Sequence, residues 1–90
     1  MANLDNKNSV VIYSTSYCPY CYAAKSLLRS RGIEYNEIDV TFDAEKRDEM
    51  VKKSGRRTVP QIFFGDKHIG GNDDLRTYVR NVLDVKGKAA

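Results

Sequence analysis

Two cysteines three residues apart, Cys18 and Cys21, constrain the fold of this 90-residue chain more than any other feature. They follow residues 10–13, a β-branched run that is typical of a buried strand. Pro19 comes directly after the first cysteine, and proline suits the first turn of a helix because no N–H is needed there. The pair is therefore predicted to lie where a strand ends and a helix begins.

The helix after the cysteines is predicted from apolar residues at helical spacing, and Gly32 is expected to end it as a left-handed cap. The apolar residues that should mark its buried face are Ala23, Ala24, Leu27 and Leu28. A second strand is predicted over residues 33–40, although its alternation of polar and apolar residues is imperfect. Strand, helix and strand within about 30 residues predict a parallel βαβ unit.

A further helix is predicted from about Asp43 to Ser54, with Asp43 as its N-cap and Gly55 as its stop. Two short strands, residues 61–64 and 67–69, are then expected to form a hairpin. The Gly65-Asp66 pair between them suits a two-residue turn with glycine at its first position.

Gly70-Gly71 is expected to break the second of these strands, and Asn72 to cap a last helix. Apolar residues at helical spacing predict the face that this helix turns to the sheet: Leu75, Val79, Val82 and Leu83. The predicted order of elements is βαβα followed by ββα, in a single domain over residues 1–90.

Composition excludes several classes of function. The net charge of +3, from 15 Lys and Arg against 12 Asp and Glu, is too small to predict a nucleic-acid-binding protein. No apolar run approaches the ~18 residues of a membrane span, and residues 1–9 lack the apolar core of a signal peptide. We therefore expect a cytoplasmic protein, in which two cysteines favour catalysis or metal binding over a structural disulfide.

The position of the cysteines predicts their chemistry. A helix start carries unpaired N–H groups and partial positive charge, which stabilise a thiolate placed there. Cys18 is therefore predicted to be the attacking nucleophile. Cys21 lies three residues further on, hence on the same side of the helix but deeper, and is predicted to be the resolving thiol.

Zinc binding and inert packing are the alternatives for this cysteine pair. A structural zinc site usually takes four ligands, but the chain has no second pair of cysteines, and its one histidine, His68, is distant in sequence. No metal site is therefore expected. Inert packing is disfavoured by the strand-to-helix junction. A CxxC motif beside a βαβ pattern instead predicts a thioredoxin-like redox site.

Three separated motifs carry a resemblance to a known family: Cys18-Pro19-Tyr20-Cys21, Thr58-Val59-Pro60 and Gly70-Gly71-Asn72-Asp73-Asp74. On these residues the chain resembles a glutaredoxin of the dithiol type, from Val10 to about Leu83. The resemblance implies a thioredoxin-like α/β fold, with a four-stranded mixed sheet flanked by three helices. It also implies a glutathione-dependent thiol–disulfide oxidoreductase, with glutathione as cosubstrate and no tightly bound cofactor. Its partners would be glutathionylated or disulfide-containing proteins, and we expect a monomer.

The resemblance also implies a set of glutathione-binding residues: Tyr20, Arg47, Arg57, Thr58, Val59, Pro60, Gly71, Asn72 and Asp73. The family pattern predicts a cis bond before Pro60, so that the backbone of Val59 can pair with glutathione like an added strand. Asn72 and Asp73, at a helix start, match the positions that bind the γ-glutamyl end, which carries a carboxylate and an ammonium group. Arg47 and Arg57 match contacts to the glycine carboxylate.

Each of these positions also has a purely structural interpretation. Tyr20 can line the glutathione groove or merely cover the helix start, and Pro60 can simply open a strand. Arg47 and Arg57 can be solvated. The acidic residues after Gly71 can serve only the helix, which is the stronger alternative for Asp74.

The chain departs from the family at one position. Many glutaredoxins carry a lysine three residues before the first cysteine, where this chain has Thr15. The change removes a cation that could stabilise the thiolate and bind the glycine carboxylate. Helix-end effects are then expected to stabilise the thiolate, and Arg47 or Arg57 to bind the carboxylate.

Two other functions are compatible with a CxxC motif on this fold. A glutaredoxin-like electron donor served by thioredoxin reductase would lack the glutathione-binding residues, so Gly71, Asn72 and Asp73 argue against it. An iron–sulfur carrier would hold a [2Fe–2S] cluster between two chains through Cys18 and two glutathiones. Such members usually have glycine and a single cysteine in the motif, whereas Pro19 and Tyr20 here stiffen and crowd the site.

Overall fold

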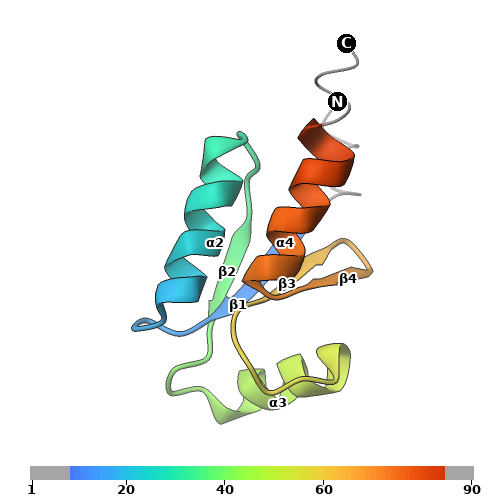
Figure 1. The fold of residues 1–90 in the computed structure, drawn as a ribbon. Helices are drawn as coiled ribbons and strands as arrows, with labels where there is room; N and C mark the ends of the chain where they lie inside the picture. The colour runs from blue at the N-terminus through green and yellow to red at the C-terminus, as the bar shows by residue number, and fades with distance from the viewer. Residues whose placement is uncertain (1–8, 85–90) are drawn as a thin grey trace.

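The structure is a computed structural model that describes residues 9–84, although nothing is stated about the side chains of residues 82–84. The last helix continues as a π-helical segment, η1 (Figure 1). In chain order the elements are β1 (Val10–Ser14), α2 (Pro19–Ser30), β2 (Asn36–Asp39), α3 (Ala44–Ser54), β3 (Gln61–Phe64), β4 (Lys67–Gly70), α4 (Asn72–Tyr78) and η1 (Val79–Asp84). This sequence of elements confirms the predicted βαβα followed by ββα.

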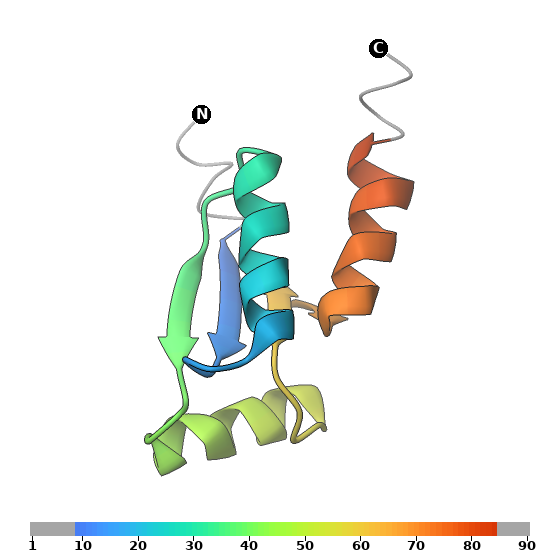
Figure 2. The same cartoon turned by 60° about the vertical axis from the view of Figure 1, so that its left-hand side comes forward.

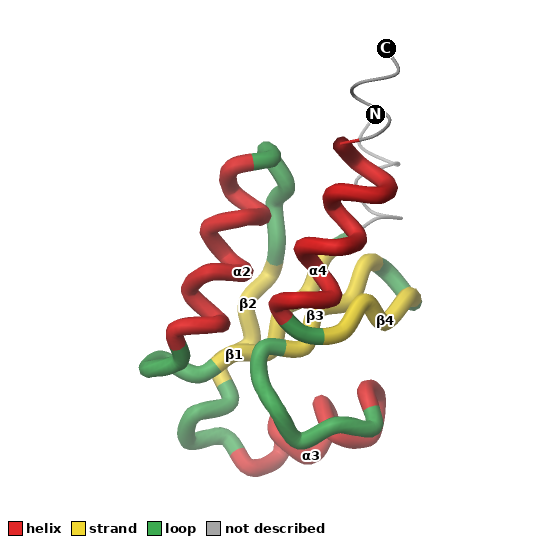
Figure 3. The backbone as a smooth tube through the Cα atoms, in the orientation of Figure 1, coloured by secondary structure: helices red, strands yellow, loops and turns green. Residues whose placement is uncertain are grey.

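The four strands form one mixed sheet in the order β2-β1-β3-β4. β1 pairs with β2 in parallel and with β3 antiparallel, and β3 pairs antiparallel with β4. The carboxyl ends of β1 and β2 therefore lie at the same edge of the sheet as the start of β3, and the loops attached to them emerge there (Figure 3). The cysteines follow β1, so this edge positions them.

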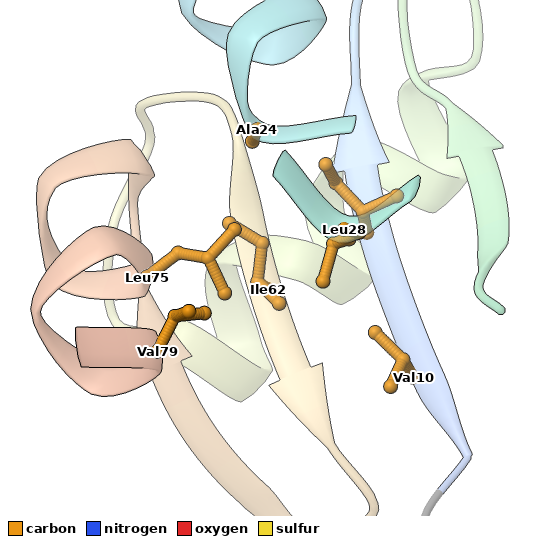
Figure 4. Close-up of a cluster of buried hydrophobic side chains, with 7 residues drawn as sticks. Val10, Ala24, Leu28, Ile62, Leu75 and Val79 are labelled. Atoms are coloured by element: carbon orange, nitrogen blue, oxygen red, sulfur yellow. The ribbon is translucent and has the colours of Figure 1, made fainter. Parts of the chain in front are cut away.

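One face of the sheet is covered by α2 and α4, which lie next to each other, while α3 crosses the molecule separately from them (Figure 2). Alternation along β1 sends every second side chain to this face, where it meets the apolar stripes of the two helices. Figure 4 shows the resulting cluster, whose buried members are Val10, Ile12, Ala24, Leu28, Ile62, Leu75 and Val79.

The opposite face of the sheet packs against α3. Its buried cluster consists of Tyr13, Val40, Met50 and Phe63. The Tyr13 hydroxyl donates a hydrogen bond of 2.6 Å to Oε2 of Glu49 on α3, which fixes the helix against the strand. Burial, and then the hydrogen bond to Glu49, raise the pKa of Tyr13, so its hydroxyl remains a donor.

The helix ends largely confirm the predictions. The Asp43 carboxylate accepts a hydrogen bond of 3.0 Å from Lys46 N at the start of α3, and Gly55 ends that helix with a φ of +74°. Gly32 likewise has a left-handed φ of +71° just after α2.

Three predictions about the elements and their buried faces are wrong. The second strand covers Asn36–Asp39 rather than residues 33–40, because Ile33 N still bonds to the Leu28 carbonyl at the end of α2. Ala23 is exposed, since the buried stripe of α2 runs through Ala24 and Leu28.

The third wrong prediction concerns the residue that caps α4. Its N-cap position is held by Gly71, and Asn72 is already the first helical residue. Leu75 and Val79 are buried as predicted, while Val82 and Leu83 lie outside the residues whose side chains are described. Within residues 9–84, no helix is both long enough and apolar enough to cross a membrane.

Candidate active site

The first cysteine, Cys18, caps the start of helix α2. Cys18 has extended backbone angles, with φ −97° and ψ 115°, and occupies the N-cap position of α2. Its sulfur accepts a hydrogen bond of 3.3 Å from Cys21 N, and its carbonyl accepts one of 3.1 Å from Tyr22 N. The sulfur therefore does what a serine or aspartate oxygen does at an ordinary helix start: it satisfies an N–H that has no partner in the helix.

The two cysteines differ sharply in their surroundings. Both are free thiols, but Cys18 is partly exposed whereas Cys21 is 1 % exposed. Burial first, and then its hydrogen bond with Cys18, raise the pKa of Cys21, while a backbone hydrogen bond from Thr15 acts in the opposite direction. Cys18 is thus the sulfur that an incoming disulfide can reach, and Cys21 is held protonated behind it.

The loop before β3 brings a carbonyl to the exposed cysteine. The peptide bond between Val59 and Pro60 is cis, as the family pattern predicted. The Cys18 thiol lies 3.9 Å from the Val59 carbonyl oxygen, at the limit of a sulfur hydrogen bond. The first and second motifs, about forty residues apart in the sequence, are therefore in contact at the sheet edge.

The third motif joins the same loop from the other side. Gly71 lies so close to the Pro60 carbonyl that a Cβ added to it would be 3.5 Å from that oxygen. The Asp74 carboxylate accepts a hydrogen bond of 3.1 Å from Gly71 N and one of 3.2 Å from the Arg56 guanidinium. Asp74 therefore ties the start of α4 to the loop that carries the cis bond, and these two bonds hold the pKa of its carboxyl below the ordinary value.

A buried polar chain supports that loop, and the sequence analysis missed it. Gln61 is fully buried, and its amide nitrogen donates to the Thr58 carbonyl at 3.0 Å and to the Thr58 hydroxyl at 3.2 Å. The Gln61 amide oxygen lies 2.7 Å from His68 Nε2. Because the Gln61 nitrogen is already donating to Thr58, the amide oxygen is the acceptor and His68 Nε2 carries the hydrogen.

Gln61 could have been found from the sequence, because it is a polar residue inside an otherwise apolar strand run and so needs partners when buried. The His68 ring nitrogen bonds to Gln61 rather than to either cysteine. The ring packs on Phe63, with ring centroids 4.8 Å apart. Burial first, and then the Arg56 charge, lower the pKa of His68.

Within residues 9–84, the side chains of the remaining predicted residues make no hydrogen bond to either cysteine sulfur. Tyr20 is 65 % exposed in the first turn of α2. Arg47 is half-buried on α3, and Arg57 is exposed in the loop before Thr58; within residues 9–84 neither guanidinium has an ion-pair partner. Asn72 and Asp73 open α4, with Asp73 exposed.

Thr15, where many glutaredoxins carry a lysine, is buried at 4 % exposure, and its neutral hydroxyl supplies no charge to an incoming ligand. A cation does lie near Cys21, however, because Lys25 follows it by one turn of α2. The Lys25 ammonium is 2.8 Å from Glu37 Oε2, which also accepts a hydrogen bond of 2.5 Å from the buried Ser14 hydroxyl. Lys25 therefore connects α2 to the edge strand β2 behind the resolving cysteine.

Within residues 9–84, neither the potential metal ligands nor the hollow against α3 indicates a second functional site. Across the described part of the chain, no three His, Cys, Asp or Glu side chains are grouped as a metal ion would require. A hollow of about 330 Å³ lies on the α3 side of the sheet, and it includes none of the predicted site residues. It is lined by Val11, Tyr13, Ile38, Glu49, Lys53, Phe63, Gly65 and Asp66.

Comparison with known proteins gives a consistent result. Residues 10–69 match the family described as Glutaredoxin. The chain is 54 % identical to Glutaredoxin 3 of Escherichia coli strain K12 over 79 residues, which cover 88 % of this chain and 89 % of that protein.

Solved structures agree with this match. The solution structure of glutaredoxin from Brucella melitensis has a TM-score of 0.74 and 48 % identity, and the match covers 88 % of this chain and 87 % of that one. The crystal structure of a buckwheat glutaredoxin–glutathione complex has a TM-score of 0.76 and 33 % identity, with coverage of 93 % and 79 %. The four-stranded sheet and three helices are therefore a thioredoxin-like fold, as predicted.

Proposed function

Because this chain belongs to the glutaredoxin family and is therefore a glutathione-dependent thiol–disulfide oxidoreductase, we propose that Cys18 is its nucleophile and Cys21 its resolving thiol. The observation that carries the assignment is the contrast between the two sulfurs. Cys18 is partly exposed at the N-cap of α2, whereas Cys21 is buried with a raised pKa. Only the first can meet a disulfide that arrives from outside.

Reduction of a glutathione mixed disulfide needs Cys18 alone. Its thiolate attacks the glutathione sulfur, the S–S bond to the substrate breaks, and the substrate leaves as a thiolate that takes a proton from water. Cys18 is then joined to glutathione. A second glutathione thiolate attacks the glutathione sulfur of this bond, which releases glutathione disulfide and regenerates the Cys18 thiolate. The net reaction converts one mixed disulfide and one glutathione into a substrate thiol and glutathione disulfide.

Reduction of a protein disulfide uses both cysteines. Cys18 attacks one substrate sulfur and forms a mixed disulfide, while the other substrate sulfur leaves as a thiolate and is protonated. Cys21 then loses its proton and attacks Cys18, which releases the second substrate thiol and forms a Cys18–Cys21 disulfide. Two glutathiones reduce that bond, leaving glutathione disulfide.

The binding site for glutathione is proposed from the family positions. In this proposal the Val59 backbone next to the cis bond pairs with the cysteine part of glutathione, and Thr58 and Pro60 hold that segment in place. Gly71, Asn72 and Asp73 receive the γ-glutamyl end at the start of α4. Support comes from the contacts that bring the cysteine, proline and glycine motifs to one edge of the sheet.

The outer parts of the site are proposed from the family positions and from the exposure of their side chains. Tyr20 would line the groove, and Arg47 or Arg57 would bind the glycine carboxylate in place of the lysine that Thr15 replaces. All three side chains reach solvent, and the two guanidiniums have no ion-pair partner among residues 9–84. We further propose that the protein acts as a cytoplasmic monomer on glutathionylated or disulfide-containing proteins, with no tightly bound cofactor.

The test is turnover of a glutathionylated peptide by single-cysteine variants of the full chain. Cys18→Ser should abolish turnover, whereas Cys21→Ser should retain much of it. Serine keeps an oxygen that can cap α2, so a far-ultraviolet circular dichroism spectrum equal to that of the wild type would show that the loss is chemical. Activity that survives Cys18→Ser contradicts the assignment. Loss of reduction of a protein disulfide in Cys21→Ser tests the resolving role separately.

A further inference from the structure

The exposed large hydrophobic side chains of residues 9–84 are gathered at one end of the molecule. There are four of them: Tyr17, Tyr20, Tyr22 and Phe42. Three surround Cys18 in the sequence. The fourth, Phe42, is 99 % exposed, and it lies on the loop between β2 and α3. Exposed apolar residues that are scattered singly need no explanation, but a gathering of them beside a reactive group marks an interaction surface.

Hydrogen bonds join the Phe42 loop to the cysteine loop. Ser16 N donates to the Thr41 hydroxyl oxygen at 2.9 Å, and the two hydroxyl oxygens are 3.5 Å apart. Tyr17 and Phe42 are the next residues along each loop, so two exposed aromatic residues come from backbone segments that these bonds hold together. Figure 1 shows both loops on the same flank of the molecule.

The loop that carries Phe42 is held at both ends. Before it, the Asp39 carboxylate accepts a hydrogen bond of 2.8 Å from Thr41 N. After it, the Asp43 carboxylate caps α3 through Lys46 N at 3.0 Å. The backbone at Phe42 is therefore held in a fixed turn, so the loop needs little further ordering when a partner covers the ring.

The order of strands places this surface opposite the proposed glutathione groove. Phe42 follows β2 and Pro60 precedes β3, and these strands lie on either side of β1. Cys18 follows β1 and so lies between them. A mixed disulfide has two halves, and a glutathione half that lies along Val59 leaves the other flank of Cys18, which carries the Tyr17 and Phe42 loops, open to the substrate half.

We propose that Tyr17 and Phe42 form a docking surface for protein substrates that carry an apolar side chain next to the reacting cysteine. This inference rests on the proposed function and adds a substrate preference to it. Whatever protein brings a disulfide to Cys18 must cover the surface around that sulfur, so the occupant is the substrate segment itself. An apolar neighbour of the substrate cysteine would remove the exposed Phe42 ring from water.

The experiment compares three glutathione mixed disulfides as substrates of the full chain. Two are peptides of equal length and charge, with either leucine or serine next to the glutathionylated cysteine, and the third is the mixed disulfide with 2-mercaptoethanol. The enzymes are the wild type, Phe42→Ser, Phe42→Tyr and a control, Glu34→Ser, on an exposed loop residue at the far end of α2. A side chain that is 99 % exposed can be changed without loss of core packing.

Phe42→Ser should lower kcat/KM for the leucine peptide by about fivefold, because the ring is only partly covered, and Phe42→Tyr should restore it. The serine peptide and the small mixed disulfide should change by less than about twofold, as should every substrate with Glu34→Ser. An unchanged leucine peptide overturns the proposal. Equal losses on all three substrates also overturn it, because Phe42 would then act on the active site itself.

The oligomeric state and the basal turnover provide two further ways to overturn the docking surface. If the wild type elutes as a dimer in gel filtration at the assay concentration and Phe42→Ser as a monomer, the surface joins two copies of the chain and the proposal is wrong. If the wild type turns over none of the three substrates, the proposed function itself fails and the docking surface fails with it. Normal turnover of the small mixed disulfide without a leucine preference refutes the docking surface alone.

Discussion

The β1–α2–β2 half and the β3–β4–α4 half of the molecule build their parts of the site in opposite ways. In the first half, both reacting sulfurs lie within one helical turn, and the hydrogen bond from Cys21 N to the Cys18 sulfur joins residues only three positions apart. In the second half, the proposed glutathione contacts come from a loop and a helix start. Buried Gln61 and the Asp74 carboxylate fasten these to their surroundings.

The residues that carry out the chemistry are therefore neighbours in the sequence, whereas the residues proposed to bind glutathione come from several separate segments. A substitution of Cys18 or Cys21 in the first half should change what happens at sulfur and leave glutathione binding intact. A substitution in the second half, even one that touches no ligand, should change affinity because it moves a carbonyl or an N–H. Four predictions test this division, from the largest expected effect to the smallest.

The largest expected effect is in the reactivity of the two thiols. At pH 7, iodoacetamide should alkylate Cys18 at least about a hundredfold faster than Cys21, because only Cys18 is accessible and burial raises the pKa of Cys21. Raising the pH to 9 should leave Cys21 unmodified. Peptide mass spectrometry after timed quenching measures both rates. Comparable rates in the folded protein would mean that the two sulfurs are not divided as described, and unfolding in urea should equalise them.

The next effect concerns the start of α4. Gly70 has a φ of +121°, and a Cβ there would overlap the Asp74 side chain. Gly70→Ala should therefore lower the free energy of unfolding by about 2 kcal/mol and raise the KM for glutathione. Urea denaturation and steady-state kinetics measure the two. Gly32→Ala is the control: it also has a left-handed φ, of +71°, but nothing lies within 4 Å of the added carbon. A loss no larger than the control's would show that contact with Asp74 is unimportant.

Gln61→Leu tests whether a buried residue outside the ligand groove supports binding. The change leaves Thr58 and His68 without their buried partner, so the free energy of unfolding should fall by about 1–2 kcal/mol. The KM for glutathione should rise several-fold while kcat changes little. His68→Phe, which keeps a ring against Phe63, should give a smaller change of the same kind. A fall in kcat with an unchanged KM would break the proposed division between the halves.

The smallest expected effect is in the ion pair between Lys25 and Glu37. Their side chains are 20 % and 35 % exposed, so solvent weakens the attraction, and a double-mutant cycle with Lys25→Met and Glu37→Gln should give under about 1 kcal/mol. The Lys25 bond lowers the pKa of Glu37, so this stabilisation is present above the ordinary Glu value of 4.5 and declines as the pH falls below it. Urea denaturation should show a smaller coupling at pH 3 than at pH 7.

The same division explains what the sequence could predict. The junction of strand and helix at Cys18, the cap at Asp43 and the stop at Gly55 follow from residues within a few positions of each other, and all were predicted correctly. The true start of the second strand, at Asn36, was missed. It depends on Ile33 N keeping its bond to the helix end, which competes with pairing to β1.

The second half was harder to predict for the same reason. The contacts of Gln61 with His68 and of Asp74 with Arg56 join residues 7 and 18 positions apart, and no spacing rule specifies either pair. The exposure of Phe42 could not be predicted from the sequence either. Its sequence neighbours do not reveal a nearly complete exposure, which depends on how the turn between β2 and α3 is held.

The hydrogen bond from Cys21 N to the Cys18 sulfur has one more consequence. Each step of catalysis changes the charge or the bonding of that sulfur, and the amide proton of Cys21 points at it in the dithiol state. The NMR chemical shift of the Cys21 amide proton should therefore report the oxidation state of the Cys18 sulfur. Catalysis can be followed in real time from an atom that takes no part in the reaction.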